Sequence, residues 1–106
     1  MRIHKVNKQP VTFDGEEYNV FRGRYPNNHA SLILSKQTIY ENIHEDDIIV
    51  SLNLIEENQA LDEVAIKNYS EMEGALGKLI REEIISEPLR HSPSGHVTVP
   101  ICKLLM

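Results

Sequence analysis

The strongest periodic pattern of apolar residues lies between residues 63 and 87. A short apolar run at 64–66 is followed by apolar residues at three- and four-residue spacing. Spacing of this kind places the side chains on one face of a helix. The pattern therefore predicts a buried strand that leads into one amphipathic helix over about 71–86. The apolar face of this helix comprises Met72, Ala75, Leu76, Leu79, Ile80 and Ile84.

Both ends of the predicted helix carry boundary signals. Ser70 and Glu73 have the spacing of a capping box, in which each side chain accepts a hydrogen bond from a backbone N–H that the first turn leaves unpaired. Pro88 disfavours helical geometry at the residue before it and so marks the other end. Gly74 and Gly77 fall within the helix, on or beside its polar side, where each costs about 1 kcal/mol relative to alanine.

The N-terminal part of the chain has the pattern of a β-hairpin. Residues 11–13 and 17–21 are rich in β-branched and aromatic side chains. Asp14 and Gly15 lie between them and tolerate the positive φ values that a tight hairpin turn requires. We expect the second strand to run on as far as residue 24 or 25.

Further strands are predicted in the middle of the chain. A turn at 26–28 precedes a third strand at 30–35, and 37–43 fits either a fourth strand or a short helix. After a turn at 45–47, residues 48–54 alternate most clearly, which is typical of an antiparallel strand with one buried face. The inward set is Ile48, Val50, Leu52 and Leu54, and the outward set is Ile49, Ser51 and Asn53.

The segments on either side of the helix complete the pattern. Residues 56–62 are a polar loop, and 88–95, with two prolines, two serines and a glycine, is predicted to be a surface loop. Residues 97–105 alternate again and predict a strand. Pro100 has no N–H to donate, so this strand should lie at a sheet edge or carry a bulge. Its inward residues are Val97, Val99, Ile101 and Leu105.

These elements together predict an α+β fold. The most economical arrangement is a two-layer sandwich, in which a mostly antiparallel sheet of about five to six strands packs against one main helix. A strongly curled sheet that wraps the helix fits the pattern equally well. The length of 106 residues corresponds to one domain, 1–106.

Composition narrows the class of protein and its compartment. No apolar run approaches the ~20 residues that span a bilayer, and the polar N-terminal segment does not resemble a secretory signal. The single cysteine, Cys102, has no partner for an internal disulfide. These features predict a cytoplasmic protein without membrane association.

The charges are unevenly distributed along the chain. Residues 41–63 hold half of the sixteen acids and no lysine or arginine. Carboxylates gathered on a rigid scaffold can imitate the phosphates of a nucleic acid and bind a basic groove, although a solvated face is the simpler interpretation. If the two ends of this segment converge, they form one negative surface. The candidate partner-binding residues are Glu41, Glu45, Asp46, Asp47, Glu56, Glu57, Asp62 and Glu63.

One basic cluster offers an alternative site. Arg22 and Arg24 are two residues apart on a predicted strand and therefore share one face. With the adjacent Tyr25 they could bind phosphate groups of a nucleic acid. Ordinary surface charge is the competing interpretation.

Catalytic and metal-binding patterns are not found in the sequence. Cys102 has no adjacent histidine base, and Ser92 and Ser94 lack the context of a hydrolase nucleophile. The five histidines do not have the spacing of a zinc site. We therefore expect a protein that is not an enzyme and uses neither a metal nor a cofactor.

Several segments resemble a family of small uncharacterised proteins carried by phages, plasmids and conjugative elements. The family pattern is similar to aIKdYSENEG followed by a tail with P.r, sGfv and PvCrL. This chain departs from it at Asn68, Met72 and His96, where the pattern has aspartate, asparagine and an aromatic residue. The segments that carry the resemblance are 64–74, 76, 84–90, 94–97 and 99–104, with a looser match at 24–28.

The resemblance implies a mobile-element origin and no established activity. It favours an anti-defence protein that binds a host defence protein, such as a CRISPR effector nuclease, through the acidic residues. The alternative is a small nucleic-acid-binding accessory protein that uses Arg22, Arg24 and Tyr25. An edge strand at 97–105 would also permit a homo-oligomer, because an unpaired edge recruits other strands.

Overall fold

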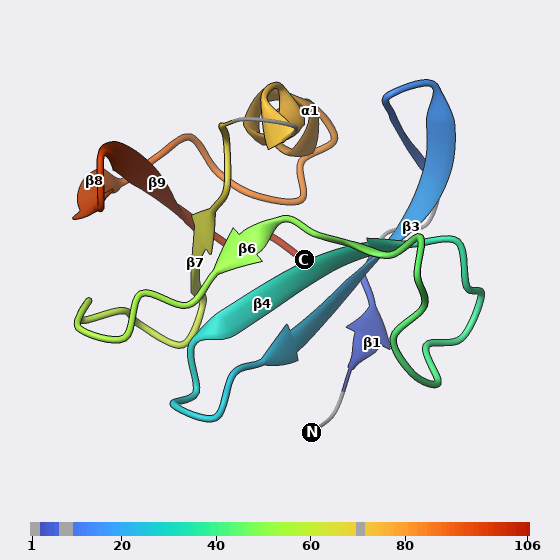
Figure 1. The fold of residues 1–106 in the computed structure, drawn as a ribbon, viewed down its shortest axis with the longest axis horizontal. Coiled ribbons are helices and arrows are strands. Elements are labelled where there is room, and N and C mark those ends of the chain that lie inside the picture. The colour runs from blue at the N-terminus through green and yellow to red at the C-terminus, as the bar shows by residue number, and fades with distance from the viewer. Residues whose placement is uncertain (1–2, 7–9, 70–71) are drawn as a thin grey trace.

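The computed structural model describes residues 3–6, 10–69 and 72–106, which form two antiparallel sheets and one helix (Figure 1). The predicted α+β class is confirmed, with the strands divided between two sheets. The first sheet contains β1 (His4–Lys5), β2 (Val11–Phe13), β3 (Glu16–Arg24), β4 (Ala30–Ser35) and β5 (Ile48–Ile49). The second contains β6 (Ser51–Leu52), β7 (Glu63–Ile66), β8 (Arg90–Ser94) and β9 (Val97–Lys103), and the helix is α1 (Ala75–Arg81).

The first sheet is built around the long strand β3. β4 pairs with one side of β3, and β1 and β2 share the other side, each along a different half. The predicted β2–β3 hairpin is confirmed, and its turn residues Asp14 and Gly15 have φ values of 53° and 80°. The third predicted strand is confirmed as β4. Residues 37–43 form neither the strand nor the helix considered for them.

The second sheet has the strand order β6-β7-β9-β8. The surface loop predicted at 88–95 is wrong for most of its length, because β8 pairs with β9 from Arg90↔Ile101 to Ser94↔Val97. Among the described residues β8 has β9 as its one neighbour in the sheet, so the missing N–H of Pro93 is tolerated there. The serines and prolines suggested a loop, but pairing with β9 makes this segment a strand.

Of the two alternatives predicted for 97–105, a sheet edge or a bulge, the edge is wrong for the strand as a whole. β9 lies between β7 and β8, and its pairing with β7 ends at Ala65↔Ile101, one residue short of Pro100. The inward position predicted for Leu105 is wrong as well, since this side chain is exposed. The position of β9 between two strands does not favour the homo-oligomer predicted through this strand, which stays a prediction.

The segment predicted as one strand at 48–54 is divided between the two sheets. β5 pairs with β4, whereas β6 pairs with β7. Val50 lies between them and bonds to both sheets. Its N–H donates to the Leu32 carbonyl oxygen (3.1 Å), and its own carbonyl oxygen accepts from the Lys67 N–H (2.7 Å).

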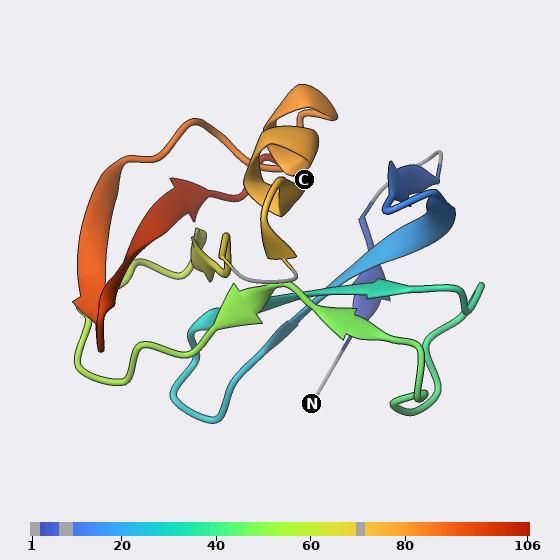
Figure 2. The same ribbon diagram turned by 45° about the horizontal axis from the view of Figure 1, so that its top comes forward.

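The helix and the two sheets surround the main apolar core, which draws residues from all three. Figure 2 shows how these elements are arranged. Leu32 and Leu34 of β4 meet Val64 and Ile66 of β7 in this core, together with residues of the helical segment. The predicted apolar face of the helix is confirmed. Met72, Ala75, Leu79 and Ile84 are buried in the core, and Leu76 and Ile80 pack against it.

The helix is shorter than predicted, because left-handed residues lie near both of its ends. Gly74 precedes its first turn with φ of 93°, and Glu83 follows its last turn with φ of 60°. Gly74 has no side chain to cap the helix, but the Asn68 side-chain oxygen accepts from the Leu76 N–H in the first turn (3.2 Å). The predicted capping box involves Ser70, which lies outside the described residues. No helix in the described part of the chain is long and apolar enough to cross a membrane.

The two helical glycines should respond to alanine in opposite directions. Gly77 lies inside α1 with open space around it, so we expect Gly77→Ala to raise the free energy of unfolding by about 0.5–1 kcal/mol. Gly74→Ala should lower it by about 1 kcal/mol, because alanine is strained at positive φ. Urea unfolding followed by circular dichroism measures both changes, and shifts in the same direction would contradict this account.

Candidate functional site

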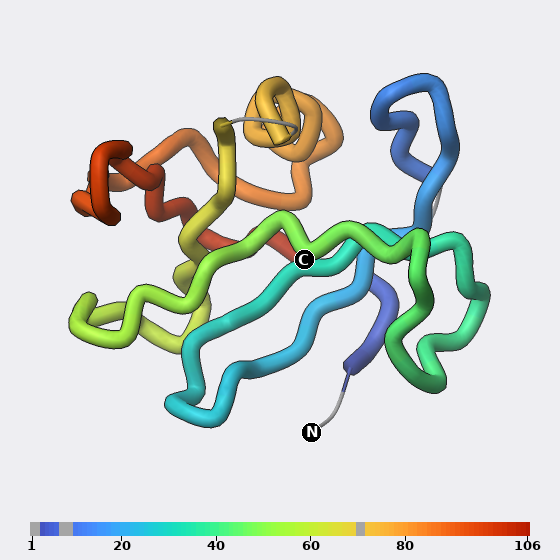
Figure 3. Tube along the Cα trace, in the orientation of Figure 1, coloured from blue at the N-terminus to red at the C-terminus, as the bar shows by residue number. Residues whose placement is uncertain are grey.

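The eight candidate carboxylates fall into two groups at opposite ends of the molecule. Glu41, Glu45, Asp46 and Asp47 belong to the loop of residues 36–47 between β4 and β5, hereafter the 36–47 loop. The other four lie in residues 56–63, which lead from β6 into β7. Figures 1 and 3 show these two segments at opposite ends of the longest axis. The two ends of residues 41–63 therefore do not converge, and the eight carboxylates do not form one continuous negative surface.

The second acidic group is largely paired within the protein. The Arg90 guanidinium lies 3.2 Å from a carboxylate oxygen of Glu57 and 2.9 Å from one of Glu63. The hydrogen bond from Arg90, and next the one from the Ala60 N–H, hold the pKa of Glu63 below its usual value. Asp62 lies 3.8 Å from the Lys103 ammonium. The paired carboxylates of Glu57, Asp62 and Glu63 hold the 56–63 segment against the second sheet, so these three are poor candidates for partner binding.

The 36–47 loop is held in place by the Gln37 side chain. Its amide donates to the Asn42 carbonyl oxygen (2.9 Å) and to the Ser35 hydroxyl (3.1 Å). Its carbonyl oxygen accepts from the Glu41 N–H (3.2 Å), and the Asn19 amide donates to the Gln37 backbone carbonyl (2.8 Å). The loop is thus fastened to strands β3 and β4 of the first sheet.

Two further contacts fix the middle and the end of the loop. The Tyr40 ring packs on Phe21 with a centroid distance of 5.3 Å. The His44 N–H donates to an Asp47 carboxylate oxygen (2.9 Å). Burial raises the pKa of Asp47, but this N–H and the hydroxyls of Ser35 and Tyr40 outweigh it, and the net shift is downward. Asp47 is therefore a structural residue of the loop.

The loop displays apolar and acidic side chains together. Ile39 is 75% exposed and Ile43 is 67% exposed. The carboxylates of Glu41, Glu45 and Asp46 are exposed beside them. Asp46 lies 3.9 Å from the Lys36 ammonium, which also binds Glu16. The loop surface is hollowed by a depression of about 550 Å³, lined by Gln37, Thr38, Ile39, Glu41, Asn42 and His44.

Sequence reasoning found the carboxylates of this loop but missed its isoleucines. In the sequence they are two apolar residues within 37–43, a segment without a clear hydrophobic period. Apolar residues in such a segment fit a buried strand or a buried helix equally well. Their exposure follows from the loop conformation, which depends on contacts with β3 and β4.

The basic cluster has a structural role. An Arg22 N–H donates to the Met106 carbonyl oxygen (2.9 Å), and an Arg24 N–H donates to the Leu61 carbonyl oxygen (2.6 Å). The hydroxyls of Tyr25 and Ser51 are hydrogen-bonded at 2.9 Å. Burial, and next the charge of Arg24, lower the pKa of Arg22. All three side chains therefore join β3 and the residue after it to later parts of the chain, which weakens the nucleic-acid-binding alternative.

The groups with nucleophilic or ligating potential do not form a reactive site in the described residues. Cys102 is fully buried, and burial, followed by the charge of Glu87, raises the pKa of its thiol to about 12. His44, Asp46 and Asp47 have ligand atoms within 4.8 Å of one another. However, Asp47 is already used within the loop, and Asp46 lies near Lys36.

Cys102 should be inert toward alkylating reagents in the folded protein. At pH 8 a thiol with a pKa near 12 is ionised in about one molecule in ten thousand, and only the thiolate reacts. We expect iodoacetamide to label the protein in 6 M urea but not under native conditions, as measured by mass spectrometry. Rapid native labelling would show that the thiol is accessible and ionisable.

The Arg90 pairing should make stability depend on pH. Because the folded-state pKa of Glu63 is lowered, its ionised form stabilises the fold above the ordinary pKa, and this contribution is lost as pH falls through the folded-state value. Glu63→Gln should therefore lower the urea midpoint at pH 7 and change it little at about pH 2. The exposed Glu56→Gln is the control. An equal loss for Glu63→Gln at both pH values would refute the assignment.

No family model, no curated protein and no solved structure matches this chain. The resemblance to mobile-element proteins therefore stays a prediction.

Proposed function

We propose that this chain is a non-enzymatic binding protein whose contact surface is the 36–47 loop. The observation that carries the proposal is the exposure of Ile39 and Ile43 on a loop fixed by side-chain contacts. Burying one large aliphatic side chain contributes about 1.5–3 kcal/mol. Two such side chains on a loop that is already held in place can act as anchors. Binding then costs little conformational entropy, because the loop is ordered beforehand.

The charges around the isoleucines indicate the chemistry of the partner. Glu41, Glu45 and Asp46 are exposed on the same loop, so the complementary surface is an apolar hollow with a basic rim. Such a rim is typical of proteins that bind nucleic acids, in which lysines and arginines contact phosphates. The carboxylates would speed the encounter with that surface, and the isoleucines would slow dissociation.

The partner that we propose is a host defence protein such as a CRISPR effector nuclease. Two features support it: the acidic loop surface and the resemblance of the chain to mobile-element proteins. The proposed contact surface includes only the carboxylates of the 36–47 loop. Those of residues 56–63 lie at the other end of the molecule. The protein would act by occupying a basic surface that the nuclease needs for nucleic acid.

The test is a binding titration with purified effector nucleases. It compares the original chain with a double variant in which both isoleucines are replaced. We expect Ile39→Ser with Ile43→Ser to weaken binding at least about tenfold, which corresponds to ~1.4 kcal/mol. Leu61→Ser is the matched control, since Leu61 is similarly exposed (63%) but lies outside the 36–47 loop. Affinity should also fall as salt rises, and Glu41→Gln with Glu45→Gln should reduce that dependence.

Two outcomes would refute parts of the proposal separately. Binding that is unaffected by the isoleucine pair would refute the 36–47 loop as the contact surface. The absence of a complex with any effector nuclease at low salt would refute this class of partner. Circular dichroism of each variant shows whether the fold is retained.

A further inference from the structure

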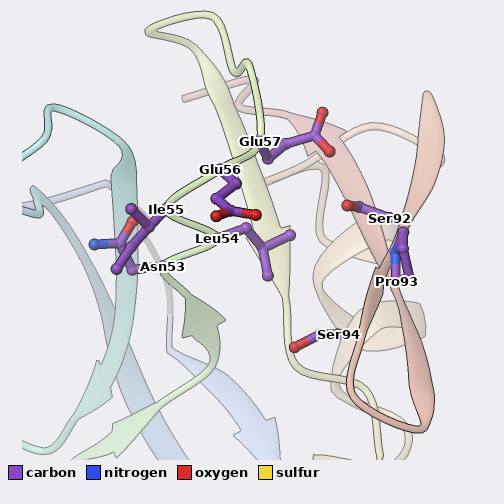
Figure 4. A pocket seen from close by; sticks show the side chains of 8 residues that line it. All are labelled: Asn53, Leu54, Ile55, Glu56, Glu57, Ser92, Pro93 and Ser94. Atoms are coloured by element: carbon purple, nitrogen blue, oxygen red, sulfur yellow. The ribbon is translucent and has the colours of Figure 1, made fainter.

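A second depression, of about 540 Å³, opens between residues 53–57 and strand β8 (Figure 4). It belongs to the end of the molecule opposite the 36–47 loop, so it is independent of the proposed function. Its walls come from two segments that are distant in sequence. The residues that line it are Asn53, Leu54, Ile55, Glu56, Glu57, Ser92, Pro93 and Ser94.

The apolar part of this depression is supported by the second sheet. Leu54 is half-buried and packs on a small cluster formed by Ala65, Val99 and Ile101, which are fully buried. This cluster is separate from the main core. Leu54 is therefore a fixed apolar surface within the depression, which Ile55 and Pro93 also line.

The polar part includes three acceptor groups from the two walls. In Figure 4 the carboxylate of Glu56 and the hydroxyls of Ser92 and Ser94 point into the space between the 53–57 segment and β8. Glu57 also lines the depression, but its carboxylate accepts from Arg90. Glu56 therefore supplies the negative charge that is open to a ligand.

The two walls are held together by Arg90, the first residue of β8. Its guanidinium donates to Glu57 (3.2 Å) and to the Asn58 carbonyl oxygen (3.1 Å), which follow directly on Glu56 in the first wall. It also donates to Glu63 at the start of β7 (2.9 Å). This bridge sets the spacing of the walls before any ligand arrives, so binding requires little rearrangement.

We propose that this depression binds a lysine side chain of a partner protein. The aliphatic stem of the lysine lies along Leu54, and its ammonium group donates to Glu56, Ser92 and Ser94. An ammonium group has three donors on a compact centre, which suits three separate acceptors on two walls. A planar guanidinium is better matched to a bidentate carboxylate, so the site should prefer lysine to arginine.

Nuclear magnetic resonance of the ¹⁵N-labelled full chain tests this proposal. The probe is an end-capped Gly-Ser-Lys-Ser-Gly peptide, compared with peptides that carry N-acetyl-lysine, norleucine or arginine in the same place. We expect saturable shifts at residues 53–57 and 92–94 with the lysine peptide. Acetyl-lysine and norleucine, which lack the charge, should bind at least about tenfold more weakly.

Variants of the chain show whether Glu56 is responsible. Glu56→Gln should weaken binding of the lysine peptide about tenfold, whereas Glu17→Gln, at an exposed position of β3 outside both candidate surfaces, should leave it unchanged. Each of four results would overturn the proposal: no saturable shift, shifts elsewhere, shifts that survive Glu56→Gln, or equal binding of the acetylated peptide. Tighter binding of the arginine peptide would overturn the assignment to lysine. None of these results depends on whether an effector nuclease binds.

Discussion

The structure depends on the way in which one short segment is shared by two sheets. The backbone of Val50 bonds to Leu32 on one side and to Lys67 on the other. The adjacent Ser51 is 3% exposed, and its hydroxyl accepts from the Leu32 N–H (3.0 Å) and bonds to Tyr25. A buried hydroxyl without partners would be costly, so these bonds are needed where the chain crosses between the sheets. The crossing also holds the two sheets face to face. As a result, apolar side chains of β4 and β7 pack in one common core.

The crossing explains why local patterns predicted some elements and not others. β4 and the β2–β3 hairpin were predicted because their signals are local: an apolar run, and an Asp-Gly turn with positive φ. The alternation at 48–54 was read as one strand with Ser51 outward. Ser51 is buried because it contacts β4, which lies some twenty residues earlier in the chain. A pattern within 48–54 carries no information about that contact. β8 was missed for the same reason, since its pairing with β9 overrides the loop-like composition of 90–94.

The charge pattern of the sequence was misleading about the site in a related way. Residues 41–63 are contiguous and strongly acidic, but the chain crosses between the sheets within them, so their two ends diverge. Ion pairs with arginine reduce the negative electrostatic field of this segment further. Arg90 lies 33 residues beyond Glu57 and 27 beyond Glu63, yet it binds both. A count of carboxylates along the chain therefore overstates the negative charge that a partner would meet. The acidic residues of the 36–47 loop were predicted; the exposed isoleucines among them were not.

The two candidate surfaces share a physical logic. Each is a segment without regular structure next to the crossing, and each is fastened by a side chain: the 36–47 loop by Gln37, and the 53–57 wall by Arg90. Hydrogen bonds made within the protein order these segments during folding. If the segments were ordered only on binding, the entropic cost of ordering them would weaken the affinity. A small protein without a reactive site in its described residues can thus present apolar and charged groups in fixed positions. Loosening Gln37 or Arg90 should weaken binding even though neither residue is proposed to contact a partner.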